Sequence, residues 1–340
     1  MKLNALLNKI ASKNDLTTDE AKDAFAAIMS GNVSPEEIAA FLMGLRVKGE
    51  SIEEISAAVA IMREKSNKVK APQGAIDIVG TGGDGTNTVN ISTMTALTVA
   101  GAGVTVAKHG NKALSSRSGA ADVLNILGVN MDAPIPIVEK SIEQAHIGFM
   151  LAPLYHPAMK YVQPIRMQLG IRTLFNLCGP MTNPANVTRL LVGTYDKSWA
   201  KPMAEVYKNF GAKHVWVVHG DDGMDEITTT TTSHIVELKD GMIREFELDP
   251  KDYGIAYASI DDLKGGEPEA NGQIIRKILN GEQKGPIYDI VALNAAAALY
   301  IAGQADNLAK GLTLAQDSIG SGKALAALEQ LIKITNILET

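Results

Sequence analysis

The feature that most constrains this chain is an alternation that begins at Ala71-Pro72, where short apolar runs end in glycine-rich loops and lead into helical segments. This alternation is typical of an α/β sheet. The run 234–238 turns through Lys239-Asp240-Gly241 into 242–248, which predicts an antiparallel hairpin. We therefore expect a mixed central sheet. The earlier strands are expected at 76–79, 104–107, 149–151, 190–193 and 215–218.

The segment before Ala71 has the pattern of amphipathic helices with clear starts. Three hydroxyl residues are each followed three positions later by a glutamate, which is the spacing of a capping box. The apolar residues recur at helical spacing, so each helix has one face to bury. Either the rest of the chain or a second subunit would cover these faces. The capping pairs are Thr17 with Glu20, Ser34 with Glu37 and Ser51 with Glu54.

Length and charge exclude several classes of protein. A chain of 340 residues exceeds the usual range of one hydrophobic core, so we expect two domains. We expect neither a membrane span nor an export signal, because the apolar runs are short and the N-terminal residues are polar. The single cysteine, Cys178, allows no intramolecular disulfide, which fits the cytoplasm, and we expect it to be packed as a small apolar residue. A net charge of −6 argues against general nucleic-acid binding.

Gly80, Gly82 and Gly85 follow a predicted strand and match the GxGxxG spacing of a dinucleotide site. Such a site needs an acidic residue about twenty positions later, yet 85–121 contains no Asp or Glu. This stretch instead carries basic residues, which in an acidic chain indicates a site for a multiply charged anion. The basic residues are Lys108, His109, Lys112 and Arg117.

Polar side chains follow the glycines at the expected N-terminus of a helix, where unpaired N–H groups and the helix dipole favour negative charge. Taken alone, this segment could be an ordinary strand-to-helix turn with a capping serine. The basic loop after the next strand favours phosphate binding. The polar residues are Thr88, Asn90, Ser92 and Thr93.

The basic loop runs from Lys108 to Asp122 and also connects a strand end to a helix, the position at which sites in open sheets gather. Lys108, Ser115 and Ser116 supply charge and donors for phosphates, and Asn111 could recognise a smaller polar substrate. His109 is either structural or functional.

Adjacent carboxylates follow the strand that ends at His219, in the run Asp221-Asp222-Gly223-Met224-Asp225-Glu226. Beside a polyphosphate they would suit Mg²⁺, which uses one or two carboxylates together with the phosphates of the substrate. The run could equally be a solvated acidic turn. The threonines at 228–232 are expected in an edge strand or a loop, without chemistry.

His156 to Lys160 is expected to open a helix that contains Arg166 and Arg172 and packs with the N-terminal helices. Arg166 either clamps a planar carboxylate with two parallel hydrogen bonds or is a solvated surface side chain. The turn at Gly179-Pro180 indicates a hinge or a crossover.

In this order, five segments resemble the anthranilate phosphoribosyltransferase family, strongly from about Ala39 to Glu226 and loosely elsewhere. A match of five motifs in order is far more specific than one glycine loop. The segments are GTGGDGTNTVNIST (80–93), KHGNKALSSRSGAADVL (108–124), APLYHPAMKYVQPIR (152–166), RTLFNLCGPMTNPA (172–185) and VVHGDDGMDE (217–226).

The resemblance implies an α/β fold like that of nucleoside phosphorylases, with a small N-terminal α-helical domain and a large α/β domain. The helical domain would span 1–72 and be joined by a helical segment at about 165–185, with the α/β domain at 73–164 and 186–340. The implied activity is the Mg²⁺-dependent transfer of a phosphoribosyl group from phosphoribosyl pyrophosphate to anthranilate in tryptophan biosynthesis. The implied assembly is a cytoplasmic homodimer formed through the helical domain, with no nucleic-acid or membrane partner.

The resemblance also implies site residues, none of them a certain acid or base. Lys108, Asp225 and Glu226 would stabilise charge, and Ser92, Asp225 and Glu226 would hold Mg²⁺. Anthranilate would meet Gly80, His109, Asn111, Arg166, Gly179 and Pro180. Phosphoribosyl pyrophosphate would meet Gly80, Gly83, Asp84, Thr88, Asn90, Ile91, Ser92, Thr93, Lys108, Asn111, Ser115, Ser116 and Ala120.

Two positions depart from the family pattern. Lys112 replaces the usual Arg, which keeps the charge but loses a bidentate fork, and Ala120 replaces a common Ser and so lacks a hydroxyl. The nearest alternative is a pyrimidine nucleoside phosphorylase, against which the Asp225-Glu226 pair and the HPAMK and GPMTNP segments speak. The acidic balance argues against a non-catalytic nucleic-acid binder, and the missing ribose-binding acid argues against a dinucleotide dehydrogenase.

Overall fold

The computed structural model describes residues 3–113 and 117–337, and the contacts within it divide the chain into two units. The helical unit comprises Met1–Lys68 and Pro153–Pro184, and the sheet unit comprises Val69–Ala152 and Ala185–Thr340. The second helical segment therefore begins at Pro153, earlier than the expected position near 165. The reason is local, because strand β3 (Ile147–Leu151) runs directly into α8 (Ala152–Tyr155) without a linker.

The first part of the helical unit consists of α1 (Asn4–Ala11), α2 (Thr18–Ile28), α3 (Pro35–Lys48) and α4 (Ile52–Glu64). All three expected capping boxes form, at Thr17, Ser34 and Ser51, so the starts of α2, α3 and α4 follow from local hydrogen bonding. The ring of Phe25 lies edge-on to those of Phe41 and Phe175, with centroids 5.5 and 6.0 Å away. These aromatic contacts fix part of the core of this unit.

The second part of the helical unit is a series of short turns rather than the expected single helix. It contains the 3₁₀ turns η1 (Pro157–Tyr161) and η2 (Pro180–Thr182) and the helices α9 (Gln163–Leu169) and α10 (Phe175–Cys178). Proline starts new turns at Pro157 and Pro164, and Gly170 ends α9 in the left-handed conformation with φ 62°. Arg172 therefore lies outside any helix. As expected, α9 packs on α3.

In the part of the chain that the structure describes, the sheet unit contains one seven-stranded sheet, in the order β3-β2-β1-β4-β5-β6-β7. The first five strands of this order, β3, β2, β1, β4 and β5, pair in parallel. The pairs β5/β6 and β6/β7 are antiparallel, which confirms the expected mixed sheet. The central position of β1 follows from its pairing with both β2 and β4. The remaining strands are β1 (Ile76–Gly80), β2 (Val106–Gly110), β4 (Arg189–Gly193), β5 (His214–Gly220), β6 (Ser233–Lys239) and β7 (Met242–Leu248).

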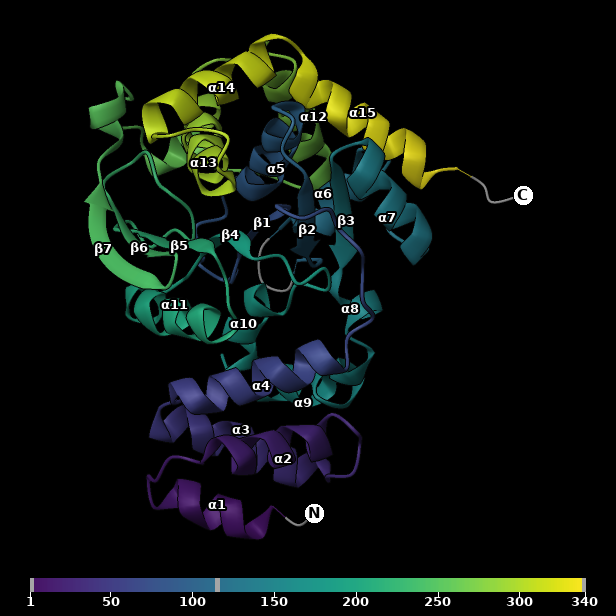
Figure 1. Cartoon of the computed structure of the whole chain (residues 1–340), viewed down its shortest axis with the longest axis vertical. Helices are drawn as coiled ribbons and strands as arrows, with labels where there is room; N and C mark the ends of the chain where they lie inside the picture. The colour runs from purple at the N-terminus through teal and green to yellow at the C-terminus, as the bar shows by residue number, and fades with distance from the viewer. Residues whose placement is uncertain (1–2, 114–116, 338–340) are drawn as a thin grey trace. The chain divides into compact units, whose positions relative to one another are not determined.

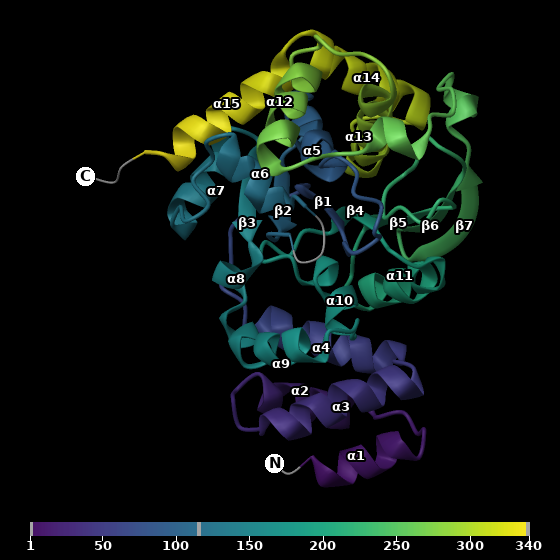
Figure 2. The same ribbon diagram turned by 180° about the vertical axis from the view of Figure 1, so that it is seen from behind.

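Helices cover both faces of this sheet (Figure 1). Helix α5 packs on β1 and β2, and α13 packs on β4 and β5, while α11 contacts β5 and β6 from the other face. Helix α12 lies beside α6, as Figure 2 shows from behind. The helices are α5 (Ile91–Gly101), α6 (Ala120–Ile126), α7 (Ile135–Gln144), α11 (Ala200–Asn209), α12 (Pro268–Leu279), α13 (Pro286–Ala302), α14 (Leu308–Gly320) and α15 (Lys323–Thr335), with 3₁₀ turns η3 (Lys197–Trp199), η4 (Pro250–Tyr253) and η5 (Ile260–Leu263).

No helix among the described residues is both long enough and apolar enough to cross a bilayer.

Candidate active site

The glycine-rich loop connects the end of β1 to the start of α5. Asn90, the N-cap residue of α5, gives no side-chain cap to the helix, so its side chain does not cover the first N–H groups of α5. Asn90 is one of the residues expected at the phosphate site, and its Nδ2 donates to the carbonyl of Ser118 at 3.0 Å. Asn90 therefore braces the loop, and the backbone N–H of Ser92 at the helix end is bonded to the Glu226 carboxylate.

The acidic run after β5 separates into two pairs with different roles. Asp221 accepts from Thr232 Oγ1 at 2.6 Å, and Asp222 accepts from Thr228 Oγ1 at 2.6 Å. The threonine tract is thus a loop whose hydroxyl groups donate hydrogen bonds to the first pair, Asp221 and Asp222. Asp225 instead reaches the glycine loop and accepts from the Gly82 N–H at 2.7 Å.

Two glycines permit this approach of Asp225 to the strand ends. A Cβ on Gly80, the last residue of β1, would lie 2.3 Å from Asp225 Oδ2. A Cβ on Gly193, the last residue of β4, would lie 1.6 Å from the carbonyl oxygen of Asp225. A side chain at Gly193 would meet the backbone of the acidic loop and push it away, whereas one at Gly80 would meet the carboxylate of the Asp225 side chain. The sequence pattern did not indicate this constraint at Gly193.

Lys108 lies in β2 and is buried, with 2% of its surface exposed. Its Nζ donates to the Ile78 carbonyl at 2.5 Å and to Ser92 Oγ at 3.3 Å. Burial lowers the pKa of the Lys108 ammonium, and the carboxylates of Asp77, Glu226 and Asp225 oppose this shift. The sequence pattern did not indicate Asp77 either, although an acid inside the apolar run of β1 was a visible signal.

Negative charge is in excess around this lysine. Burial and the nearby Asp84 raise the pKa of Asp225 to about 7. Burial and the carboxylate of Asp225 raise the pKa of Glu226. A divalent cation would relieve this repulsion, so the donor set fits Mg²⁺. Residues 3–113 and 117–337 contain no group of three His, Cys, Asp or Glu side chains placed to hold a metal. In proteins Mg²⁺ usually takes one or two carboxylates together with phosphate oxygens and water.

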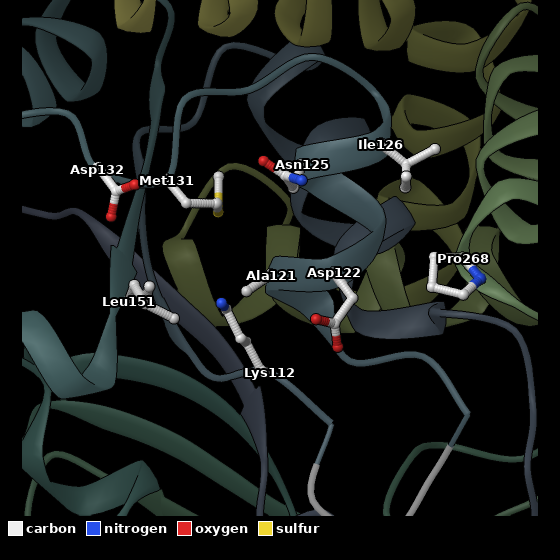
Figure 3. A pocket seen from close by; sticks show the side chains of 9 residues that line it. All are labelled: Lys112, Ala121, Asp122, Asn125, Ile126, Met131, Asp132, Leu151 and Pro268. Carbon is white, nitrogen blue, oxygen red and sulfur yellow. The ribbon is translucent and has the colours of Figure 1, made fainter.

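The basic loop after β2 is closed at its base by Asp122. One oxygen, Oδ2, accepts from the Ala113 N–H at 2.8 Å and from the Gly119 N–H at 3.0 Å. Ser115 and Ser116, expected to bind phosphate, lie outside the described residues. In Figure 3 the Lys112 side chain points into a pocket of about 260 Å³, beside Ala121 and Leu151.

The other residues of the sheet unit that were expected to bind a substrate lie in the same loops, near the end of β2 and at the starts of α5 and α6. His109 is buried, and its backbone N–H donates to Asp77 Oδ1 at 3.1 Å, while Asn111 accepts from the Lys112 N–H at 2.8 Å. Gly83 has a positive φ of 74°, and Thr88 forms an isolated bridge with Lys264. Ile91 and Thr93 are buried in the first turn of α5, and Ala120 begins α6.

Arg166 lies on α9 in the helical unit and is partly buried, which lowers its pKa. Its Nη1 donates to Gln163 Oε1 at 3.3 Å and its Nη2 to Asn176 Oδ1 at 3.4 Å. No described carboxylate lies within 4.0 Å of it. A partly buried guanidinium without an acidic partner suits a carboxylate ligand. Nearby Cys178 is buried, and burial raises the pKa of its thiol to about 12, so it packs as an inert residue.

The residues expected to meet anthranilate therefore divide between the units. Gly80, His109 and Asn111 belong to the sheet unit. Arg166 and the Gly179-Pro180 turn, at which α10 ends and η2 begins, belong to the helical unit.

The family models identify the chain as a member of a glycosyl transferase family. Residues 72–325 match the family model described as "Glycosyl transferase family, a/b domain", and residues 4–66 match that of the helical bundle domain of the same family. The two matches together cover most of the chain.

Relatives of known function specify the family further. The anthranilate phosphoribosyltransferase of Rhodopseudomonas palustris (strain HaA2) is 51% identical, over 97% of this chain and 98% of its own length. The crystal structure of the Thermus thermophilus enzyme has a TM-score of 0.92 and 41% identity, over 97% of this chain and 99% of that one. The Saccharomyces cerevisiae enzyme in complex with PRPP and Mg has a TM-score of 0.91 and 30% identity, over 99% of this chain and 98% of the yeast chain. A further structure of the yeast enzyme contains 4-fluoroanthranilate. The chain belongs to the anthranilate phosphoribosyltransferase family.

Proposed function

We propose that this chain transfers the phosphoribosyl group of phosphoribosyl pyrophosphate to anthranilate, giving N-(5-phosphoribosyl)anthranilate and pyrophosphate in tryptophan biosynthesis. One observation carries the proposal. Asp225 and Glu226 face the glycine loop and the buried Lys108, an arrangement suited to a polyphosphate with its cation. The yeast relative in complex with PRPP and Mg supports it.

The proposed division of roles follows the two units. The sheet unit binds phosphoribosyl pyrophosphate through the N-terminus of α5, Lys108 and the glycine loop. Ser92, Asp225 and Glu226 hold Mg²⁺, which when bound neutralises charge on the pyrophosphate. Arg166 clamps the carboxylate of anthranilate, and Gly179-Pro180, His109, Asn111 and Gly80 line the rest of its site. The remaining phosphoribosyl pyrophosphate contacts are Gly83, Asp84, Thr88, Asn90, Ile91, Thr93, Asn111, Ser115, Ser116 and Ala120.

The reaction needs little acid–base chemistry. The amine nitrogen of anthranilate forms a bond to ribose C1 while the bond from C1 to the pyrophosphate oxygen breaks, with inversion and an oxocarbenium-like transition state. The electron pair leaves with pyrophosphate, and the amine proton passes to solvent. An aromatic amine is already neutral at pH 7, so catalysis rests on positioning and on stabilisation of the leaving group by groups such as Lys108.

We further propose that the chain is a cytoplasmic homodimer. The exposed large apolar side chains of the helical unit include Met43 and Val47 on α3 and Met167 on α9, at 43, 66 and 72%. A second copy packed on this unit would cover them. Light scattering of the purified protein should give twice the monomer mass of 36.1 kDa. A monomer mass would refute this assembly.

The test of the activity follows the fluorescence of anthranilate after phosphoribosyl pyrophosphate and Mg²⁺ are added to the purified protein. We expect the signal to fall, and to stay constant when EDTA is present. No fall, together with phosphorolysis of uridine or thymidine, would replace this proposal with a nucleoside phosphorylase.

A further inference from the structure

Asn271 lies on α12, outside every segment that carries the expected site, and only 1% of its surface is exposed. Its Nδ2 donates to Asn90 Oδ1 at 3.0 Å, and its Oδ1 accepts from the Gly266 N–H at 2.8 Å. Both ends of this buried amide are therefore bonded within the sheet unit. A buried amide with satisfied partners fixes geometry, because breaking it leaves polar groups unpaired.

Asn90 links Asn271 to Ser118 of the basic loop through hydrogen bonds. Besides donating to the Ser118 carbonyl, Asn90 accepts from Ser118 Oγ at 3.2 Å. Three segments far apart in the sequence thus meet at one cluster, Asn90, Ser118 and Asn271. Two of them carry the residues expected to bind phosphoribosyl pyrophosphate.

The segment just before α12 also lies along the glycine loop. The Val89 N–H donates to the Leu263 carbonyl at 2.9 Å, and the Gly265 N–H donates to the Asn87 carbonyl at 3.0 Å. A Cβ on Gly265 would lie 2.9 Å from both the Thr88 carbonyl oxygen and Asn271 Oδ1. Residues 263–271 therefore form a continuous support for residues 87–90.

We propose that Asn271 is a positioning residue for the phosphoribosyl pyrophosphate site. It acts through Asn90, whose orientation it fixes, and so holds the glycine loop against Ser118. This inference rests on the proposed function and adds to it a residue that does not itself touch the substrate.

The test measures binding of phosphoribosyl pyrophosphate with Mg²⁺ by calorimetry, and steady-state kinetics, for wild type and Asn271→Ala. We expect the Kd and KM for phosphoribosyl pyrophosphate to rise about three- to tenfold, as for one lost hydrogen bond, and the KM for anthranilate to stay constant. Ser118→Ala removes a neighbouring bond of the cluster and should raise the same Kd if Asn271→Ala does not fold.

A double-mutant cycle separates positioning from general stability. In an Asn90→Ala background, Asn271→Ala should have no further effect on the Kd, because the hydrogen bond through which Asn271 acts is already absent. The control is Ser318→Ala, which removes a buried bond to the Thr98 carbonyl of 2.7 Å in the same unit and should lower Tm without changing the Kd. Additive effects in the cycle, or an Asn271→Ala protein that loses only Tm, would overturn the proposal.

The two proposals fail in different ways. A wild-type protein that binds phosphoribosyl pyrophosphate but leaves anthranilate unchanged would refute the proposed function, and the binding test of Asn271 would still apply.

Discussion

Asn294, in the middle of the apolar helix α13, binds the backbone of Ile227 on both sides: its Oδ1 accepts from the Ile227 N–H at 3.0 Å and its Nδ2 donates to the Ile227 carbonyl at 2.8 Å. Nδ2 also donates to the Ile290 carbonyl at 2.9 Å. Because Ile227 follows Glu226 directly, this fully buried side chain sets the position of the acidic pair.

We expect Asn294→Leu to cost about 2–4 kcal/mol of unfolding free energy, because it leaves two backbone groups unpaired in the core. The concentration of Mg²⁺ that gives half-maximal activity should also rise. Urea unfolding and a Mg²⁺ titration check the two effects. An unchanged Mg²⁺ dependence would show that Asn294 serves stability alone.

A side chain at Gly193 should disable the acidic loop. Since a Cβ there would lie 1.6 Å from a backbone oxygen, which cannot rotate away, Gly193→Ala must displace Asp225. We expect a fall in kcat/KM of about 10²-fold or more, comparable to the loss of a transition-state contact. Gly320→Ala is the matched control, because a Cβ at Gly320 meets nothing within 4 Å. Similar activity of both variants would contradict the geometry.

Within the acidic run, only the second pair should matter for turnover. We expect Asp225→Asn and Lys108→Ala each to lower kcat by roughly 10²-fold or more. Asp221→Asn should stay near the wild-type rate, since Asp221 is bonded to Thr232 and Lys197 rather than to the glycine loop. Steady-state kinetics of the three variants decide this, and full activity of Asp225→Asn would refute its assigned role.

Arg166 should govern affinity for anthranilate rather than the chemical step. We expect Arg166→Ala to raise the KM for anthranilate with little change in kcat, because a carboxylate clamp holds ground state and transition state alike. Arg166→Lys should recover only part of the affinity, since an ammonium lacks the bidentate fork. A loss confined to kcat would place Arg166 in the transition state instead.

Glu237 should make part of the stability depend on acid pH. Burial alone would raise the pKa of Glu237, but bonds to His214, Trp216 and Arg244 lower it from 4.5 to about 2. A depressed pKa in the folded state stabilises the protein above pH 4.5, and this stabilisation is lost as the pH falls toward 2. Glu237→Gln should therefore cost about 1–3 kcal/mol at pH 7 and progressively less below pH 4.5. Urea unfolding at a series of pH values measures the difference, which a pH-independent cost would contradict.

Much of the fold was predictable because local patterns carry it. The capping pairs at Thr17, Ser34 and Ser51 need only neighbouring residues, and the strands need only apolar runs and turns. The expected helix through Arg166 and Arg172 was wrong, since Pro157, Pro164 and Gly170 interrupt it. The prediction gave too little weight to proline and glycine, which start and end helices locally.

The supports of the candidate site were not predictable from the sequence. Asn271 and Asn294 act through contacts with residues far away in the chain, and a lone asparagine in an apolar helix gives no sign of its partner. The same limit applies to Gly193, whose need for a bare Cα arises only when the acidic loop folds over β4. The different roles of the two acidic pairs in the run Asp221 to Glu226 could not be predicted either. The threonine loop that bonds to the first pair approaches it only when the chain folds.

The bond between Asn90 and Asn271 joins residues 181 positions apart, and this separation has a consequence for synthesis on the ribosome. At about 5–20 residues per second, the glycine loop is made roughly 10–40 s before the segment that supports it. A nascent chain that ends before Leu263 contains all five segments that resemble the family, yet lacks the support for residues 87–90. If Asn271 positions the site as we propose, we expect capture of substrate to be among the last properties that the growing chain acquires.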